Sequence, residues 1–278
     1  MFRFSKKGSV EYLEATALSK GDFLIHAFCT RRGGISKEKF SSLNFSAWEG
    51  DRRDNVRQNG EITASAFDLC ADQFFFVNQV HGDGILIVDR TNRHFAGDKM
   101  YQCDAIITDQ PGLAIGIKTA DCVPVFLADM EKKIIGVVHA GWRGTALRIA
   151  AKAVIAFNES FSSRSEEMIA VTGPAIGPCC YQVDEAVFQA MQGDKQGESA
   201  FMPCREKGKW MFDLASANRG QLLKAGVRRE NIFSADICTS CRKDIFYSHR
   251  GEGGKTGRQL SFMMLKERES SGEEKCLT

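Results

Sequence analysis

The chain is dominated by short apolar runs separated by polar turns, the pattern of a protein rich in β-structure. Runs of β-branched and aromatic residues bounded by turn residues predict strands. The first predicted strand region covers residues 11–30, with its apolar part at 23–28. Further strands are predicted at 74–80, 85–88, 105–108, 113–117, 123–127, 134–138, 168–171, 232–237 and 260–265.

Apolar positions recur at helical spacing in only a few segments. The clearest stripe is Ala146, Ile149, Ala150, Ala153, Val154 and Phe157, which falls on one face of a helix. Helices are also predicted at 54–67, 183–191 and 214–225. Strands outnumber helices, and many neighbouring strands are close enough in sequence to form hairpins. We therefore expect an α+β fold: a single domain, residues 1–265, with mixed, largely antiparallel β-sheets flanked by helices, and a flexible tail over 266–278.

A thiol and an imidazole stand at the two ends of one predicted hairpin. If Leu127 pairs with Ile134 across the polar turn, the same antiparallel register pairs Cys122 with His139. Directly opposed residues have Cβ atoms about 4.5–5.5 Å apart. That separation suits one shared metal ion or a thiolate–imidazole pair, so the two residues are candidates for an active site.

His81 extends this pair to a set of three. It follows the predicted strand at 74–80 and precedes a glycine. Taken singly, Cys122 is compatible with a buried core cysteine, and each histidine with a structural role. Together, one cysteine and two histidines at strand ends match a zinc site with three protein ligands and an open fourth position.

Composition limits the classes of partner. Of 278 residues, 43% are hydrophobic and 26% are charged, with a formal net charge of +2. So small a charge provides no field for nucleic-acid or membrane binding, and any anionic ligand must be held by local arginines. No apolar run has the length of a membrane span or of a signal peptide's core. The expected location is therefore cytoplasmic.

Four segments carry a family resemblance. They read NQVHG at 78–82, ADCVP at 120–124, HAGWRG at 139–144 and GPAIGPCCY at 173–181. In this order and spacing they resemble the bacterial laccase-domain family, first called polyphenol oxidoreductases and later purine nucleoside phosphorylase/adenosine deaminase enzymes. The resemblance places the metal ligands, which are also catalytic, on His81, Cys122 and His139. One departure from the family pattern is His249, which replaces a residue that is usually aromatic.

The resemblance implies zinc-dependent phosphorolysis of adenosine-, inosine- and guanosine-type nucleosides and of methylthioadenosine, together with hydrolytic deamination of adenosine. The partners are then a small nucleoside and inorganic phosphate; the sequence predicts no oligomeric state. Bound zinc lowers the pKa of water to about 7, which suits hydrolysis. Asp121 is a further catalytic candidate, although a regular strand turns its side chain away from Cys122, where it would orient a ligand indirectly.

Three arginines are candidates for binding phosphate or substrate. Arg143 opens the helix that follows His139, where backbone amides also attract anions. Arg31 lies in a glycine-rich turn, and its guanidinium can bind phosphate through two hydrogen bonds. Arg250 lies in the late segment that resembles the family.

Other functions remain open from the residues alone. A multicopper oxidase needs more than the five histidines present, but a single copper ion suits a set of two histidines and one cysteine. A metal-free hydrolase would use Cys122 as nucleophile and His139 as base, and a binding module would use neither. The C-x-x-C segment at 238–241 is not expected to bind metal, because no second C-x-x-C exists and Cys179–Cys180 is a poor partner.

Overall fold

Three β-sheets form the framework of the protein, which is a computed structural model describing residues 1–92 and 101–267. The first sheet has the strand order β1 (Phe2–Lys7), β2 (Val10–Ala15), β3 (Leu24–Cys29), β15 (Gln259–Leu265), β7 (Ala114–Thr119) and β4 (Phe74–Phe76). The second has the order β14 (Ile232–Ser234), β10 (Ile169–Thr172), β8 (Val123–Asp129), β9 (Ile134–Ala140), β6 (Ala105–Thr108) and β5 (Ile85–Val88). A small third sheet contains β11 (Gln182–Asp184), β13 (Lys209–Phe212) and β12 (Phe201–Pro203).

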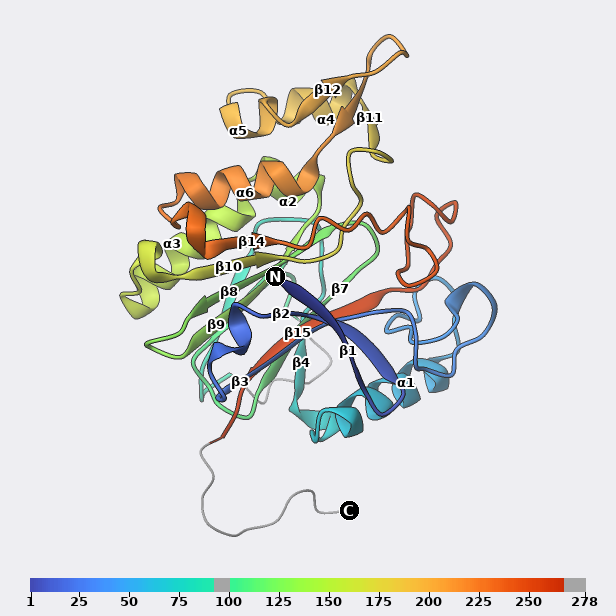
Figure 1. Ribbon diagram of the computed structural model, residues 1–278, viewed down its shortest axis with the longest axis vertical. Helices are drawn as coiled ribbons and strands as arrows, with labels where there is room; N and C mark the ends of the chain where they lie inside the picture. The colour runs from blue at the N-terminus through green and yellow to red at the C-terminus, as the bar shows by residue number, and fades with distance from the viewer. Residues whose placement is uncertain (93–100, 268–278) are drawn as a thin grey trace.

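Helices cover the outer faces of the two large sheets (Figure 1). The helices are α1 (Arg53–Ala66), α2 (Trp142–Ala146), α3 (Ile149–Phe161), α4 (Glu185–Ala190), α5 (Lys195–Glu198) and α6 (Leu214–Lys224). Figure 1 shows α1 beside the first sheet, α3 and α6 over the second, and α4 and α5 with the third sheet at one end. The layers are therefore helix, sheet, sheet and helix.

The core lies between these layers. Phe28 of β3 stacks on Phe126 of β8 with ring centroids 4.1 Å apart, which joins the two large sheets. On the other face of the second sheet, Phe157 of α3 packs over Gly136 of β9; a Cβ at position 136 would lie 2.8 Å from that ring. Both faces of β8 and β9 are buried, which explains their continuous apolar runs.

The hairpin of β8 and β9 holds the predicted catalytic pair, but its register differs from the prediction by two residues. Asp129 pairs with Ile134 and Pro124 with His139, so the continued register places Cys122 opposite Gly141. The strands run further toward the turn than expected because the Asp129 carboxylate accepts the Lys132 N–H (2.9 Å) and closes a tight turn over 130–133. Side chains alternate with a period of two, so Cys122 and His139 still share a face.

The fold class is as predicted: an α+β fold whose sheets are mixed and mainly antiparallel. The predicted helix from 146 to 157 is divided, because Arg148 takes a left-handed conformation (φ 65°) between α2 and α3. The strand expected over 74–80 ends at Phe76, and the sequence pattern missed β1, β11, β12 and β13. Most of the predicted tail, 266–278, lies outside the described residues.

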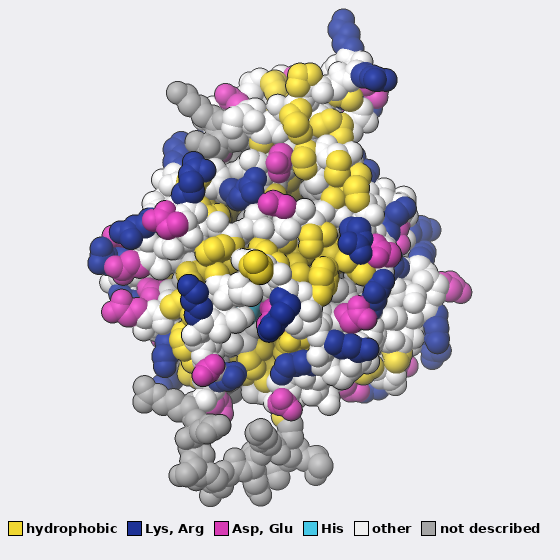
Figure 2. Space-filling view, in the orientation of Figure 1, with side chains coloured by type: hydrophobic (Ala, Val, Ile, Leu, Met, Phe, Trp, Pro, Cys, Tyr) yellow, Lys and Arg dark blue, Asp and Glu magenta, His cyan; other side chains and the backbone are white. Residues whose placement is uncertain are grey.

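Charge is evenly distributed on the face seen in Figure 2, where basic and acidic side chains are interspersed. This agrees with the small net charge. Within 1–92 and 101–267, no helix combines the length and apolarity that crossing a membrane requires.

Candidate metal centre

His81, Cys122 and His139 converge from three different segments. His81 lies in the turn after β4, Cys122 directly precedes β8, and His139 lies near the end of β9. One nitrogen of each histidine and the Cys122 Sγ all lie within 4.8 Å of one another. His139 is buried, Cys122 is half-buried and His81 is exposed, so the group is open to solvent on the His81 side. Two imidazoles and one thiolate at this spacing are a donor set suited to zinc or copper.

Asp104, which the sequence analysis did not single out, holds two of these residues in place. Its Oδ1 lies 2.7 Å from the Nδ1 of His139 and accepts the backbone N–H of His81 at 2.9 Å. Its Oδ2 accepts the N–H groups of Val80 (3.2 Å) and Gly82 (2.7 Å). The carboxylate thus fixes the Nδ1 of His139, leaves Nε2 for a ligand, and stabilises the left-handed backbone of His81 (φ 60°).

Gly141 allows the ligands to approach one another. A Cβ at this position would lie 3.1 Å from both the Cys122 Sγ and the Cδ2 of His81. The Gly141 φ angle is −76°, so the requirement for glycine is one of space and not of backbone conformation.

The charges of the group favour a deprotonated thiol. Burial disfavours the Cys122 thiolate, but the charge and hydrogen bond of His139, with those of His81, lower the pKa of Cys122 to about 6. Burial likewise opposes protonation of His139, yet the Cys122 thiolate and the Asp104 carboxylate raise the pKa of His139 to about 9. Without a metal, the two residues form a thiolate–imidazolium pair near pH 7; a metal binds the thiolate and replaces the imidazolium proton.

Alkylation of metal-free protein should report this pair directly. We expect the rate of Cys122 modification by iodoacetamide to rise through about pH 6, well below the value of about 8.5 for an ordinary thiol. Added zinc should block the reaction. Peptide-level mass spectrometry follows Cys122, and Cys204 serves as the control thiol outside the group. A rise near the ordinary thiol pKa, or a rate unaffected by zinc, would contradict metal ligation by Cys122.

Asp121 lies before β8 with a positive φ of 92°, not in a regular strand as expected, and its hydrogen bonds go to residues other than the candidate metal ligands. Its Oδ1 accepts the Thr239 Oγ1–H at 2.7 Å, and its Oδ2 accepts the Arg250 backbone N–H at 2.7 Å. Asp121 therefore positions the segment from 239 to 250, and the role of orienting a ligand belongs to Asp104 instead.

The three predicted arginines have different surroundings. The Arg31 guanidinium donates to the carbonyl oxygens of Ser41 and Lys243 (both 2.8 Å) and to Glu252 (2.9 Å), so most of its donors are engaged within the protein. Arg143 lies over the Trp142 ring, and among the described residues no acidic group pairs with it. Arg250 donates to the Gln182 carbonyl at 2.7 Å. Arg143 is thus the freest of the three to bind an anion.

Tyr181 is a further residue beside the centre that the sequence analysis quoted but gave no role. Burial raises the pKa of its phenol, as do the charges of Cys122 and Asp121, while Arg250 and Arg143 oppose the rise. Its ring also lies 5.2 Å from the Arg250 guanidinium. The phenol remains protonated at neutral pH and can act as a hydrogen-bond donor.

The structure contradicts one ground for expecting no metal at residues 238–241, namely that Cys179 and Cys180 are poor partners. Cys238 and Cys241 do have partners, because Cys179 and Cys180 lie beside them with all four Sγ atoms within 4.8 Å. Spacing along the chain does not favour this pairing, but the fold brings the two segments together.

Comparison with known proteins identifies the family and agrees with the fold. A family model described as multi-copper polyphenol oxidoreductase laccase matches residues 25–266. The purine nucleoside phosphorylase YlmD of Geobacillus stearothermophilus is 36% identical over 244 residues, which are 86% of this chain and 89% of that protein. The purine nucleoside phosphorylase YfiH of Escherichia coli is 32% identical over 237 residues, 85% of this chain and 91% of that protein.

A solved structure shows the same architecture. The crystal structure of YlmD from Geobacillus stearothermophilus superimposes with a TM-score of 0.87 and 32% identity, covering 95% of this chain and 99% of that one. Since the family model spans nearly the whole described chain and the relatives align over most of their lengths, this protein belongs to the multi-copper polyphenol oxidoreductase laccase family.

Proposed function

We propose that this protein is a metal-dependent purine nucleoside phosphorylase. The observation that carries the proposal is the group of His81, Cys122 and His139, held by Asp104 and open to solvent on the His81 side. Relatives that align over most of the chain are named purine nucleoside phosphorylases, which supports the substrate class.

Zinc is the proposed metal, held by one nitrogen from each histidine and by the Cys122 thiolate. When bound, zinc supplies a Lewis acid that stabilises negative charge developing on the substrate. The protein contributes the deprotonated thiolate, the fixed orientation of His139 and the rigid turn at His81. Copper is the alternative for the same donor set; a blue copper-loaded protein that oxidises phenols without acting on nucleosides would favour it.

In phosphorolysis, an oxygen of inorganic phosphate forms a bond to C1′ of the ribose while the bond from C1′ to the purine nitrogen breaks. The purine leaves with the electron pair of that bond and takes up a proton. Arg143 is the proposed phosphate-binding residue, since its guanidinium offers paired donors that no described carboxylate occupies. Arg250, whose guanidinium lies 5.2 Å from the Tyr181 ring, and the neutral Tyr181 phenol are proposed to contact the nucleoside.

We propose hydrolytic deamination of adenosine as a second reaction of the same centre. Water adds at C6, the exocyclic nitrogen leaves as ammonia, and inosine remains. Zinc sites built from histidine and cysteine support this reaction in base deaminases, and the exposed His81 leaves one side of the group accessible. Inosine, guanosine and methylthioadenosine remain proposed substrates for phosphorolysis.

Products from adenosine test the proposal. With phosphate we expect adenine or hypoxanthine together with ribose 1-phosphate, and without phosphate only inosine, followed by chromatography. His139→Ala should form none of them. Failure of the folded, zinc-loaded protein to form any product above this variant would refute a nucleoside enzyme.

Replacing Arg143 with glutamine should raise the KM for phosphate by about 10- to 100-fold, because a charge-assisted hydrogen bond contributes about 1.5–3 kcal/mol. The matched control is Arg53→Gln on the exposed start of α1, which should leave the KM unchanged. If the KM for phosphate stays at the wild-type value in Arg143→Gln, another residue binds phosphate.

A further inference from the structure

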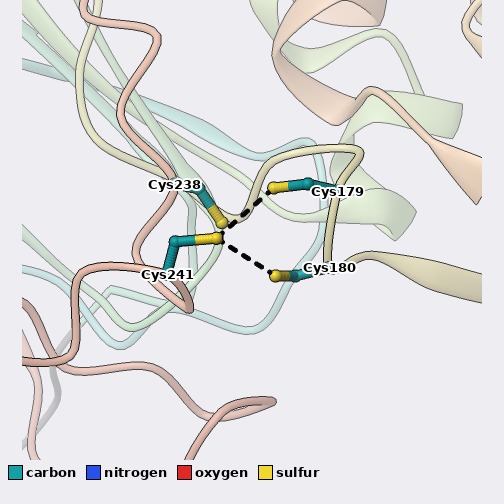
Figure 3. A group of neighbouring side chains, drawn as sticks. All are labelled: Cys179, Cys180, Cys238 and Cys241. Atoms are coloured by element: carbon teal, nitrogen blue, oxygen red, sulfur yellow. Dashed lines mark hydrogen bonds between the residues drawn. The ribbon is translucent and has the colours of Figure 1, made fainter.

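A second group of potential metal ligands lies outside the candidate active site. Cys179 and Cys180 belong to the loop between β10 and β11, and Cys238 and Cys241 to the loop after β14. The four side chains point toward one another (Figure 3). The Cys241 Sγ lies 3.6 Å from that of Cys179 and 3.4 Å from that of Cys180, and all four sulfur atoms lie within 4.8 Å of one another.

Backbone hydrogen bonds also hold the two loops in this arrangement. Ala175 and Cys238 form a parallel bridge, in which the Thr239 N–H donates to the Ala175 carbonyl at 3.0 Å. The Gly177 carbonyl then accepts the N–H groups of Cys180 and Tyr181 (both 3.0 Å). This turn presents two adjacent cysteines on the same side, so their lack of C-x-x-C spacing does not prevent them from sharing a ligand.

Gly177 adds two features suited to a thiolate site. Its N–H donates to the Cys238 Sγ at 3.2 Å, which stabilises negative charge on that sulfur. A Cβ at position 177 would lie 3.4 Å from the Cys179 Sγ and 3.2 Å from the Cys238 Cβ, so only glycine leaves the sulfurs this room without a shift.

The geometry points to a metal rather than to a disulfide. Zinc binds four thiolates at about 2.3 Å in a tetrahedron, which places the sulfurs about 3.8 Å apart. The observed separations of 3.4–3.6 Å, with none above 4.8 Å, are close to this value, whereas a disulfide requires about 2.05 Å. Cys179 and Cys241 are exposed, so apolar burial does not explain the cluster.

We propose that Cys179, Cys180, Cys238 and Cys241 bind one structural Zn²⁺ ion as four thiolates, at a site separate from His81, Cys122 and His139. Binding releases the thiol protons to solvent and involves no change of oxidation state. Four protein ligands leave no open position, so this ion has no direct part in catalysis.

The proposed ion joins the two loops that carry the substrate contacts. Tyr181 directly follows Cys180, and Thr239 lies between Cys238 and Cys241 and donates to Asp121. Asp121 in turn accepts the Arg250 N–H. The four cysteines are therefore positioning residues for Tyr181 and Arg250. This positioning role rests on the proposed function. The proposal that the cysteines bind zinc does not depend on it.

Metal content separates the two sites. Full-length protein purified from zinc-supplemented cells should contain about two zinc ions per chain by mass spectrometry of the metal, one for each ligand group. About one zinc ion per chain should be lost in the double variant Cys238→Ser/Cys241→Ser, and likewise in the single variant Cys122→Ser. The control Cys204→Ser should lose no zinc. The double variant should also lower kcat/KM for the nucleoside by about 10-fold, mainly through KM.

The double variant could lose zinc because it misfolds. A second measurement therefore uses a protein in which the four cysteines of the cluster are intact. Cobalt added to metal-free Cys122→Ser should give the strong thiolate-to-metal absorption and visible bands of a tetrahedral four-sulfur site. Absence of those bands, equal zinc content in wild type and the double variant, or a disulfide within the cluster in freshly isolated protein would overturn the proposal. Nucleoside activity plays no part in these readouts, so failure of the proposed function leaves this test intact.

Discussion

Replacing Asp104 with alanine should remove both metal binding and much of the stability of the protein. The carboxylate is fully buried and is shared by His139 Nδ1 and the N–H groups of residues 80–82. Breaking a buried charged pair costs about 3–5 kcal/mol of unfolding free energy, and loss of a residue that orients a ligand weakens metal affinity by about 10- to 100-fold. Chemical denaturation and zinc titration measure the two effects.

Two further variants sharpen this prediction. Asp104→Asn retains the shape of the side chain and one acceptor oxygen. We therefore expect it to lose less stability and less zinc affinity than Asp104→Ala. The control is Asp22→Ala, which removes an exposed carboxylate. It should leave the unfolding free energy and the zinc affinity unchanged. Wild-type zinc affinity in a folded Asp104→Ala protein would contradict the assigned role.

The stabilisation by Asp104 should also depend on pH. Although burial raises the pKa of this carboxyl, hydrogen bonds from His139 and the backbone of Gly82 and His81 lower it below its ordinary value. A lowered pKa means that the stabilisation is present above the unfolded pKa of about 4 and is lost as the pH falls through the folded value. The difference in unfolding free energy between wild type and Asp104→Asn should therefore shrink in acid.

Gly141→Ala should abolish most activity while leaving the backbone conformation allowed. The added methyl group would lie 3.1 Å from the Cys122 Sγ and from the Cδ2 of His81, so the ligands must separate. A displacement of about 1 Å at a reacting centre costs up to about 100-fold in rate. We expect kcat/KM and zinc affinity to fall together.

Gly60→Ala is the matched control for this substitution. Gly60 lies within α1, and nothing lies within 4 Å of a Cβ built there. The same methyl group should there stabilise the protein by up to about 1 kcal/mol, because alanine favours helix over glycine, with no change in activity. Equal activities of Gly141→Ala and Gly60→Ala would show that the ligands are not packed as described.

The sequence was sufficient to predict the α+β class and the shared face of Cys122 and His139, because both depend on local patterns. Alternation placed Cys122 and His139 on one face, and a two-residue error in register preserved that face. The error arose at the turn, where Asp129 was expected to lie outside the strand. Because its carboxylate accepts the Lys132 N–H, Asp129 instead pairs with Ile134 and lengthens the hairpin. Strand alternation carries no information about such side-chain contacts.

Other parts of the site depend on contacts between distant segments. Asp104 binds a turn more than twenty positions before it and a histidine further along the chain; no local pattern marks it as different from any other aspartate. The cysteine cluster joins residues about sixty positions apart. Arg31 looked as suitable for phosphate as Arg143, and only the structure shows that carbonyl groups and Glu252 engage it.

The description of the family as multi-copper oxidoreductases and the names of the relatives suggest different chemistry. The donor set itself is compatible with zinc or with a single copper ion. The charges of Cys122, Arg250 and Arg143 all act on the Tyr181 phenol, and this arrangement supports our proposal of an anionic co-substrate. The reaction products therefore decide between a nucleoside phosphorylase and a phenol oxidase.

The most direct test is the formation of ribose 1-phosphate from inosine and inorganic phosphate, followed by phosphorus NMR for zinc-loaded wild type and for folded Cys122→Ser. Our account predicts that the wild type forms ribose 1-phosphate and hypoxanthine in equal amounts, and that Cys122→Ser is slower by at least about 100-fold. Equal rates in the two proteins, or no ribose 1-phosphate from the wild type, would contradict the proposal that His81, Cys122 and His139 form the centre of a purine nucleoside phosphorylase.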